Sequence, residues 1–403
     1  MPATRPPPVR QRPWGCRAAC AAASAALLTA CTGARQAPEP APATAPPALR
    51  LIGTAAIAPG TEVLGTTFGG ISGIDYDPVR GRWLLISDDR SALQPVRIYT
   101  ATLRYTATQM EAPAITGTAP LRQASGAPFP SPRRPEPGVD VPDAEAVRWL
   151  PGGDGLLWTS EGDFARGFGP QLREARADGA WVRNFPLPAA FTPSADRQRG
   201  PRANATLEGL ALSPDGRTAW LAMEAAWVQD GPRPTPQAPG GPLRITAIDI
   251  ASGEALRQIA YVPDAVAHAR RIPWGPQWNG VSEILADGPH HLLVLERSYS
   301  AGAGFSARLY RIDTRAGSDT LALPALKTEG TALDTATPKT LVADLGQLGA
   351  GTLDNLEGMA WGPPLPTGGR VIVFVSDDNF NPAQATQFIA VEYRPAATGT
   401  AAP

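Results

Sequence analysis

One hairpin pattern recurs five times along this chain of 403 residues. Each copy has an apolar strand, a turn rich in Gly, Pro or Asp, and a second apolar strand that ends in an acid. Strands of this composition, separated by such turns, predict β-hairpins. The five copies are Ser72 to Asp89, Glu145 to Glu161, Glu208 to Glu224, Glu283 to Glu296 and Glu357 to Asp378.

The copies begin at intervals of about 60 to 75 residues, which leaves room for two further strands in each interval. Four strands at this period are the layout of a propeller blade. The recurrence therefore predicts an all-β fold, a β-propeller with five blades. Six blades are possible if one blade is degenerate. A β-sandwich, or two small β-domains, is the alternative architecture.

The last blade lacks one strand, and one strand at the start of the repeat region is unassigned. The fifth hairpin is followed by only one further strand, residues 386–393, whereas residues 49–57 precede the first hairpin and belong to no blade. We predict that this N-terminal strand supplies the missing outer strand and closes the ring, which removes exposed strand edges. The propeller then occupies residues 49–395, and residues 396–403 form a disordered tail.

The N-terminus has the features of a bacterial export signal. Four arginines and no acid precede an apolar run from Ala18 to Ala30, which is too short to span a membrane. The run ends in Leu-Thr-Ala-Cys31, which resembles a lipobox. We predict a lipoprotein signal peptide over residues 1–30, a lipid anchor on Cys31 and a Pro/Ala-rich tether over residues 31–48. The chain would be exported and held at the bacterial membrane, with Thr32 favouring the outer membrane. An ordinary secretory signal is the alternative.

The charge and the cysteines exclude several classes of function. The whole chain carries 36 basic and 37 acidic residues, and loss of the basic leader would leave the mature protein acidic. Binding of nucleic acid through bulk charge is therefore not expected. No cysteine follows Cys31, so the propeller has neither a disulfide nor a cysteine-based metal site. We expect a monomer.

The acids of the five hairpins are expected to converge. In an antiparallel hairpin the start of the first strand faces the end of the second. Pairs such as Glu208 with Glu224, and Glu283 with Glu296, are centred on the turns between them, so both members would lie at the same end. Inner strands of this kind would bring nine or ten carboxylates to one mouth of the central channel. The candidate metal ligands are Asp88, Glu145, Glu161, Glu208, Glu224, Glu283, Glu296, Glu357, Asp377 and Asp378.

So many neighbouring carboxylates require compensation by cations, arginines or water. Hard cations take oxygen ligands, and Ca²⁺ is the leading candidate. Asn204, Asn279 and Asn355 precede three of the glutamates and could add neutral oxygen ligands. Arg90 and Arg297 follow acids directly and could pair with them instead. In the structural alternative, the acids cap turns or form ion pairs between blades.

The strings EGLALSPDG, LLVLER, NLEGMAWG and VSDDNFNPAQATQFIAVEY, with SEGD at 160–163, resemble the phytase-like family described as "esterase-like activity of phytase". The resemblance covers about residues 65–395. The family is distantly similar to alkaline propeller phytases, in which Ca²⁺ ions at one channel mouth bind phosphates and position the attacking water. Those phytases have six blades, so a count of five departs from them.

The resemblance implies a metal-dependent phosphoesterase or esterase acting on a small phosphorylated or ester substrate. The acids of the hairpins would supply metal ligands or a base. Glu208, Glu224 and Arg297 would be catalytic, with Arg297 contacting the phosphate.

Two other functions are open. A serine esterase would require a nucleophile elbow, but Ser72 lies in GGISGI rather than G-x-S-x-G, and His268 is the one plausible base. A non-catalytic surface propeller could instead bind a protein, a glycan or a phosphorylated ligand.

Overall fold

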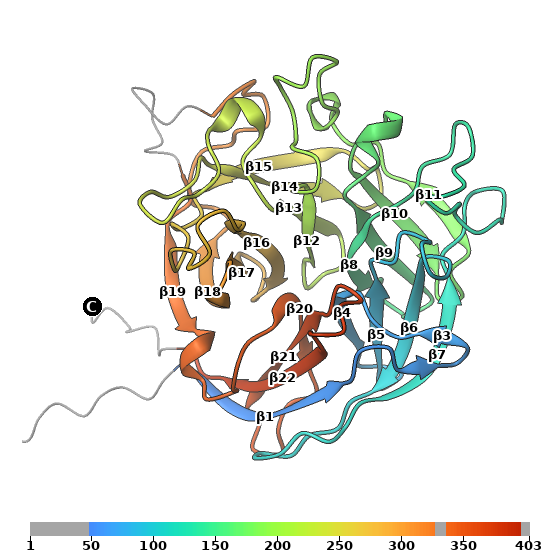
Figure 1. Ribbon diagram of the computed structural model, residues 1–403, viewed down its shortest axis with the longest axis vertical. Coiled ribbons are helices and arrows are strands. Elements are labelled where there is room, and N and C mark those ends of the chain that lie inside the picture. Colours follow the sequence, from blue (N-terminus) through green and yellow to red (C-terminus); the bar gives the residue numbers. More distant parts are fainter. Residues whose placement is uncertain (1–47, 327–335, 396–403) are drawn as a thin grey trace, which may run out of the picture. The chain divides into compact units, whose positions relative to one another are not determined.

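The computed structural model describes residues 48–326 and 336–395. The predicted signal peptide, Cys31, nearly all of the tether, and the tail lie outside these residues. Five four-stranded antiparallel sheets surround a central axis (Figure 1). The predicted five-bladed all-β propeller is therefore confirmed. No helix among the described residues is long and apolar enough to span a membrane.

Each blade begins at the axis with its inner strand and runs outward. Blade 1 consists of β4 (Ile71–Asp77), β5 (Arg82–Ser87), β6 (Arg97–Thr102) and β7 (Ala114–Pro120). Blade 2 consists of β8 (Ala144–Trp149), β9 (Gly155–Ser160), β10 (Gln171–Arg176) and β11 (Trp181–Asn184). Blade 3 consists of β12 (Leu207–Leu212), β13 (Thr218–Met223), β14 (Leu243–Asp249) and β15 (Ala255–Tyr261).

The last two blades complete the ring. Blade 4 consists of β16 (Gln277–Ala286), β17 (His291–Ser300), β18 (Gly304–Asp313) and β19 (Lys339–Asp344). Blade 5 consists of β20 (Asn355–Gly362), β21 (Arg370–Asp377), β22 (Thr386–Tyr393) and β1 (Leu49–Ile57). A small hairpin, β2 (Glu62–Val63) and β3 (Thr66–Thr67), and the short 3₁₀ helices η1 (Phe164–Arg166), η2 (Ala189–Phe191), η3 (Val228–Asp230) and η5 (Leu345–Gln347) lie in connections.

The N-terminal strand closes the ring as predicted. β1 is antiparallel to β22, and its register runs from Leu49 opposite Tyr393 to Ile57 opposite Thr386. Blade 5 thus takes three strands from the end of the described chain and one from its start. This pairing provides β22 with a hydrogen-bonded neighbour, so the last blade has the same four strands as the others.

Neighbouring blades pack through buried apolar faces. The cluster between blades 1 and 5 contains Ile74 and Leu85 from one sheet and Val373 and Phe388 from the other, and all four are fully buried. Aliphatic and aromatic residues suit these positions because they fill a pleated surface that is covered on both sides. The packed sheets form the rigid frame on which the inner strands present their ends.

A buried ion pair lies on the axis where the five inner strands meet. Arg148 of β8 and Glu283 of β16 are 3% and 0% exposed, and an Arg148 guanidinium nitrogen lies 2.7 Å from a Glu283 carboxylate oxygen. Arg148 also donates to carbonyl oxygens, and Glu283 accepts from backbone N–H groups. These backbone partners are Ile74, Val147, Ile284 and Met359 for Arg148, and Leu210 and Ile284 for Glu283. The pair, called the axial plug below, therefore bonds to all five inner strands.

Candidate functional site

The inner hairpins share an irregularity at one end of the ring. Each pairing of the first two strands of a blade shows a register shift close to the start of the inner strand. A β-bulge of this kind turns an extra side chain away from the regular alternation. The shifts lie between Ile71 and Gly73, Ala144 and Val147, Leu207 and Gly209, Val281 and Glu283, and Leu356 and Gly358. Glu145, Glu208 and Glu357 lie within three of these bulges.

A cavity of about 920 Å³ opens at this end of the ring. Eight carboxylates line it, together with two arginines and several amides and aromatic side chains. This cavity is called the acidic mouth below. Its carboxylates belong to Asp88, Asp143, Glu145, Glu161, Glu208, Glu224, Glu357 and Asp377, and its arginines are Arg233 and Arg297. Seven of these acids are among the ligands expected from the sequence.

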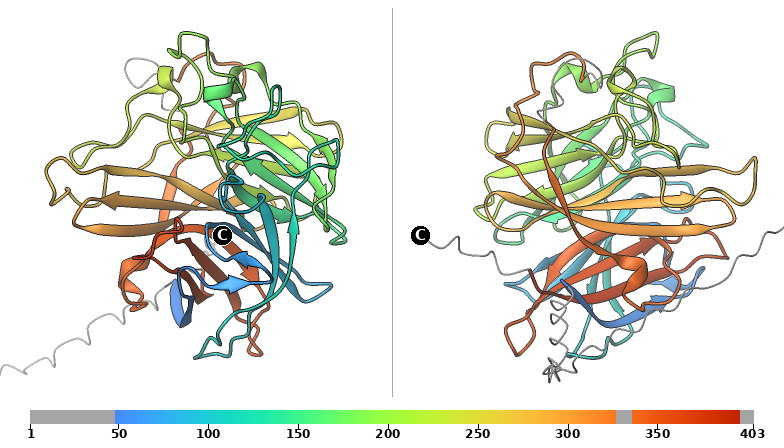
Figure 2. Two further views of the ribbon diagram at one scale, coloured as in Figure 1. Left: turned by 45° about the vertical axis from the view of Figure 1, so that its right-hand side comes forward. Right: turned by 90° about the vertical axis from the view of Figure 1, so that its left-hand side faces the viewer.

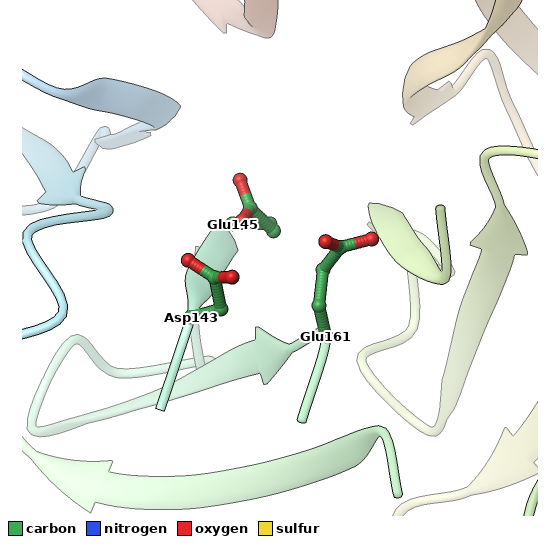
Figure 3. A group of neighbouring side chains, drawn as sticks. All are labelled: Asp143, Glu145 and Glu161. Atoms are coloured by element: carbon green, nitrogen blue, oxygen red, sulfur yellow. The ribbon is translucent and has the colours of Figure 1, made fainter. Parts of the chain in front are cut away.

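Three of the acids form a compact group on blade 2. Asp143 directly precedes β8, Glu145 is its second residue, and Glu161 follows the end of β9. One carboxylate oxygen from each lies within 4.8 Å of the other two, and all three residues are buried. Their carboxyl groups point toward a common space (Figure 3). Oxygen atoms spaced in this way can share one cation.

The protein provides few donors to these acids. Glu161 accepts from the backbone N–H of Thr206, and an Arg90 guanidinium nitrogen lies 3.4 Å from an Asp143 oxygen. The side chains of Glu145 and Glu208 accept no hydrogen bond from any residue that the structure describes. A buried carboxylate without a donor is costly when ionised, so an external partner would stabilise this part of the mouth.

Burial and crowding raise the pKa values of these carboxyl groups. The pKa of Glu145 lies well above the ordinary value, mainly because the group is buried and also because of the negative charges of Glu208 and Asp143. Burial, Glu161 and Glu224 likewise raise the pKa of Glu208. Burial raises the pKa of Asp143 to about 6, although Arg90 acts in the opposite direction. Raised pKa values are expected for carboxyl groups that are held close together without a cation.

Two buried oxygen atoms in the mouth have no hydrogen-bond partner among the described residues. They are Oδ1 of Asp88 and Oδ1 of Asn355. The Nδ2 group of Asn355 donates to Glu357 at 2.8 Å and to Asp377 at 3.3 Å, which leaves its oxygen free to act as a ligand. Buried polar atoms of this kind are rare and usually bind water or an ion. Together with the acids of blade 2, they support a cation site.

Arg297 compensates the opposite side of the mouth. Its guanidinium lies 3.1 Å from a Glu357 oxygen and 3.5 Å from a Glu224 oxygen. Burial alone would lower the pKa of Arg297, but Glu357 and Glu224 raise it overall, so the group stays charged. Its Nε atom is buried and has no partner within the described residues. The mouth is thus divided into a carboxylate side on blade 2 and a cationic side on blade 4.

The donor set fits a hard divalent cation. Carboxylate and amide oxygens are available, whereas neither sulfur nor imidazole nitrogen lines the cavity in the described parts of the chain. Ca²⁺ accepts six to eight such oxygens in flexible geometry. Eight carboxylates against two arginines leave a negative excess that one or more such ions would offset.

Three residues predicted from the sequence lie outside the mouth. The expected pairing of Glu283 with Glu296 is wrong, because Val281 lies opposite Glu296, whereas Glu283 follows the bulge, lies opposite Leu295 and reaches the axis. There Glu283 belongs to the axial plug, where burial raises its pKa to about 7 against the effect of Arg148. Asp378 accepts from the backbone of Gly70 and Phe380 and so holds two loops together.

Glu296 lies in a separate polar network between blades 3 and 4. It accepts from the hydroxyl of Tyr261 at 2.6 Å, from Lys339 and from Asn279. Asn279 is therefore engaged there, whereas Asn204 and Asn355 line the acidic mouth. Glu296 therefore has a structural role: its ion pair with Lys339 joins two strands of blade 4, and its bond with Tyr261 reaches blade 3.

Several residues of the site were not predicted from the sequence. Asp143 lies two residues before Glu145, directly ahead of β8, so its closeness in sequence to a predicted ligand could have indicated it. Arg233 and the aromatic side chains Trp278, Tyr299 and Phe305 also line the cavity, and no pattern in the sequence marked them. Among the described residues, no hydrogen bond joins a serine hydroxyl to a histidine ring, and His268 lies outside the cavity.

Residues 66–380 match the sequence model of a family described as phytase-like, with esterase-like activity of phytase. The chain belongs to the phytase-like family. The match spans every inner strand and every acid of the mouth. The family resemblance expected from the sequence is therefore confirmed for this part of the chain. No curated protein matches the phytase-like chain significantly.

Solved structures resemble this phytase-like propeller only remotely. An α-L-arabinofuranosidase from Podospora anserina has 10% identity and a TM-score of 0.42, covering 86% of this chain and 98% of its own. The catalytic domain of a GH62 α-L-arabinofuranosidase from Coprinopsis cinerea has 10% identity and a TM-score of 0.39, with coverage of 86% and 98%. A protein of unknown function from Dyadobacter fermentans has 12% identity and a TM-score of 0.37, with coverage of 86% and 100%. At these identities and TM-scores, none of these proteins indicates a function for this chain.

Proposed function

We propose that this phytase-like chain is a Ca²⁺-dependent phosphoric ester hydrolase that acts at the acidic mouth. The observation that carries this is one cavity with two chemically different sides. Three buried carboxylates converge within 4.8 Å on blade 2, and Arg297 lies across from them with an unpartnered Nε. A site that binds cations on one side and anions on the other suits a phosphate held with its counterion.

Asp143, Glu145 and Glu161 would hold the first cation, and Asp88 and Asn355 offer the free oxygens for a second. When bound, a divalent cation offsets the charge of a phosphoryl group and polarises its oxygens as a Lewis acid. The carboxylates also benefit, because the cation compensates charges for which the protein has no donor. Binding should therefore stabilise the folded domain.

Arg297 is placed to bind the phosphate. Glu224 and Glu357 fix its guanidinium on one edge, and Gly280 lies opposite it in the β16–β17 pairing. A side chain at position 280 would collide with Glu224, so glycine lets Glu224 pack closely against β16 beside Arg297. A fixed guanidinium can donate two parallel hydrogen bonds to phosphate oxygens.

Glu208 is the carboxyl group best placed to exchange a proton. It lies in the bulge of blade 3, between the carboxylate side and Arg297, and it accepts no hydrogen bond from the described residues. A buried carboxyl without a fixed partner can take a proton from water or give one to the leaving alcohol oxygen. Glu224, held by Arg297, would act mainly by positioning that arginine.

Hydrolysis of an aryl phosphate by the full-length chain tests this function. We expect Ca²⁺-dependent release of phosphate, loss of activity with a chelator, and loss of at least a hundredfold in kcat for Glu208→Gln. Glu254→Gln is the matched control, because Glu254 is exposed and lies outside the mouth. Activity that survives both chelation and Glu208→Gln would refute the proposal. Ca²⁺ binding without hydrolysis of any ester would favour a propeller that only binds its ligand.

We also propose that the protein is an exported lipoprotein anchored through an acylated Cys31. The lipobox-like sequence before Cys31 supports this. The full-length chain should fractionate with bacterial membranes, and Cys31→Ala should abolish acyl labelling. Labelling that persists in Cys31→Ala would contradict the proposed anchor.

A further inference from the structure

Blade 4 differs from the other blades at the acidic mouth. β16, β17 and β18 are each ten residues long, whereas the inner strands of the other blades have six to eight residues. The additional residues lie on the side of the mouth, and the gold-coloured strands project beyond the rest of the ring in Figure 2. Blade 4 therefore provides a wall beside the cavity.

Three aromatic side chains form a row across this wall. Trp278 on β16 is the register partner of Tyr299 on β17, which is the register partner of Phe305 on β18. The ring centroids of Trp278 and Tyr299 are 4.7 Å apart, as are those of Tyr299 and Phe305. All three rings are partly exposed and line the cavity. This row is called the aromatic wall below.

The aromatic wall continues from Arg297. Tyr299 follows Arg297 by two residues on β17, so both side chains lie on the same face of the strand. Two residues of a strand span roughly 7 Å. A ring joined to a phosphate at Arg297 could therefore reach Tyr299 and Trp278. Cross-strand aromatic pairs also stabilise hairpins, but that role alone would not require the rings to face the cavity.

We propose that the aromatic wall binds a planar ring in the alcohol part of the substrate. This rests on the proposed function, because Arg297 is taken to hold the phosphate. The substrate class is then a monophosphate ester of an aromatic alcohol or of a nucleoside. A polyol with phosphates on every side has no ring face for these side chains. Stacking of one ring on such residues contributes roughly a tenfold or greater preference.

Calorimetric titration of the full-length chain with two non-hydrolysable probes tests this inference. Phenylphosphonate and methylphosphonate carry the same anionic group, and only the first has a ring. In the presence of Ca²⁺, we expect phenylphosphonate to bind about tenfold more tightly. Trp278→Leu and Tyr299→Leu should reduce this ratio to about two while leaving methylphosphonate binding unchanged. Trp274→Leu is the matched control, because Trp274 is 87% exposed, close in sequence to Trp278 and outside the cavity.

The outcomes separate this inference from the proposed function. Equal affinities for the two probes, or a ratio that neither wall variant changes, would overturn the aromatic wall and leave phosphate binding intact. A ring preference without hydrolysis of any ester would support the wall and refute the hydrolase. Binding of neither probe would overturn both. Thermal unfolding of each variant shows whether a lost preference reflects a lost fold.

Discussion

The axial plug and the acidic mouth both contain buried charge on the axis of the same ring, yet they are built in opposite ways. In the plug, one arginine and one glutamate face each other at 2.7 Å and bond to the backbone of all five inner strands. In the mouth, eight carboxylates and two arginines line one cavity, and Glu145 and Glu208 accept no hydrogen bond from the described residues.

The charged groups of the plug are compensated within the protein, whereas the carboxylates of the mouth would be compensated by a bound ligand. A buried ion pair whose hydrogen bonds are all made needs no further ligand. Removal of one partner leaves the charge of the other uncompensated. A cluster of like charges destabilises the folded state until a counterion binds. The same change, from a carboxylate to an amide, should therefore have opposite consequences in the two regions.

The largest effect is expected in the plug. Arg148→Met should remove the one positive partner that Glu283 has among the described residues and leave carbonyl groups of four blades without this donor. We expect a loss of about 3–5 kcal/mol in the free energy of unfolding, measured by denaturant titration. The double variant Arg148→Met/Glu283→Leu should recover part of this loss. A loss below about 1 kcal/mol would show that the plug does not hold the ring together.

The pH dependence of the metal-free protein sharpens the comparison. The pKa values of Asp88, Glu145, Glu161, Glu208 and Asp377 are raised by burial and by each other, and that of Asp143 rises to about 6. A raised pKa in the folded state contributes stability that is complete below the unfolded value and is lost as pH rises through the folded value. Stability should therefore fall by about 2–3 kcal/mol between pH 5 and pH 8.

Calcium should remove most of that fall. Thermal unfolding at pH 5 and pH 8, with a chelator and with excess Ca²⁺, measures the effect. A metal-free protein that is equally stable at both pH values would contradict the view of the mouth as an uncompensated cluster.

Matched amide substitutions test the opposite signs directly. At pH 8 without metal, Glu145→Gln should stabilise the domain by about 1.4 kcal/mol, a tenfold step in the folding equilibrium, because it removes one like charge. Glu283→Gln should destabilise the domain because it weakens the bond to Arg148. Unfolding curves of the two variants and of the exposed Glu254→Gln give the comparison. The same sign for both variants would remove the distinction between the regions.

The smallest effect concerns the cationic side of the mouth. Arg297→Lys keeps the charge but loses the planar pair of donors. We expect KM for an aryl phosphate to rise about fivefold, equivalent to about 1 kcal/mol, with kcat changed less. Initial rates over a range of substrate concentrations measure both constants. An unchanged KM would show that Arg297 does not contact the phosphate.

The repeat made most of the fold predictable. Five hairpins of one pattern predicted the number of blades. The strand at residues 49–57 belonged to no blade, and the last blade lacked one strand, so their pairing predicted how the ring closes. The two strands of a hairpin are close in sequence, so the residues that lie opposite each other can be predicted from the position of the turn. The convergence of Glu145, Glu161, Glu208, Glu224, Glu357 and Asp377 followed from the same rules.

The β-bulges and the axial plug could not be predicted from the repeat pattern. In β16 the extra residue of the bulge is Ser282, so Glu283 lies one position past the bulge and reaches the axis; a simple pairing count assumes that no bulge exists. Arg148 takes its partners from blades 1, 4 and 5, which are far apart in sequence. Contacts of this kind depend on how the blades meet at the axis, which local strand patterns do not encode.

Calorimetric titration of the metal-free, full-length chain with Ca²⁺ at neutral pH tests the central claim, that the acidic mouth is a cation site. The account predicts saturable binding of at least one ion per chain, loss of that binding in Glu145→Gln, and unchanged binding in the exposed control Glu254→Gln. Absence of saturable binding, or equal binding in wild type and Glu145→Gln, would contradict it.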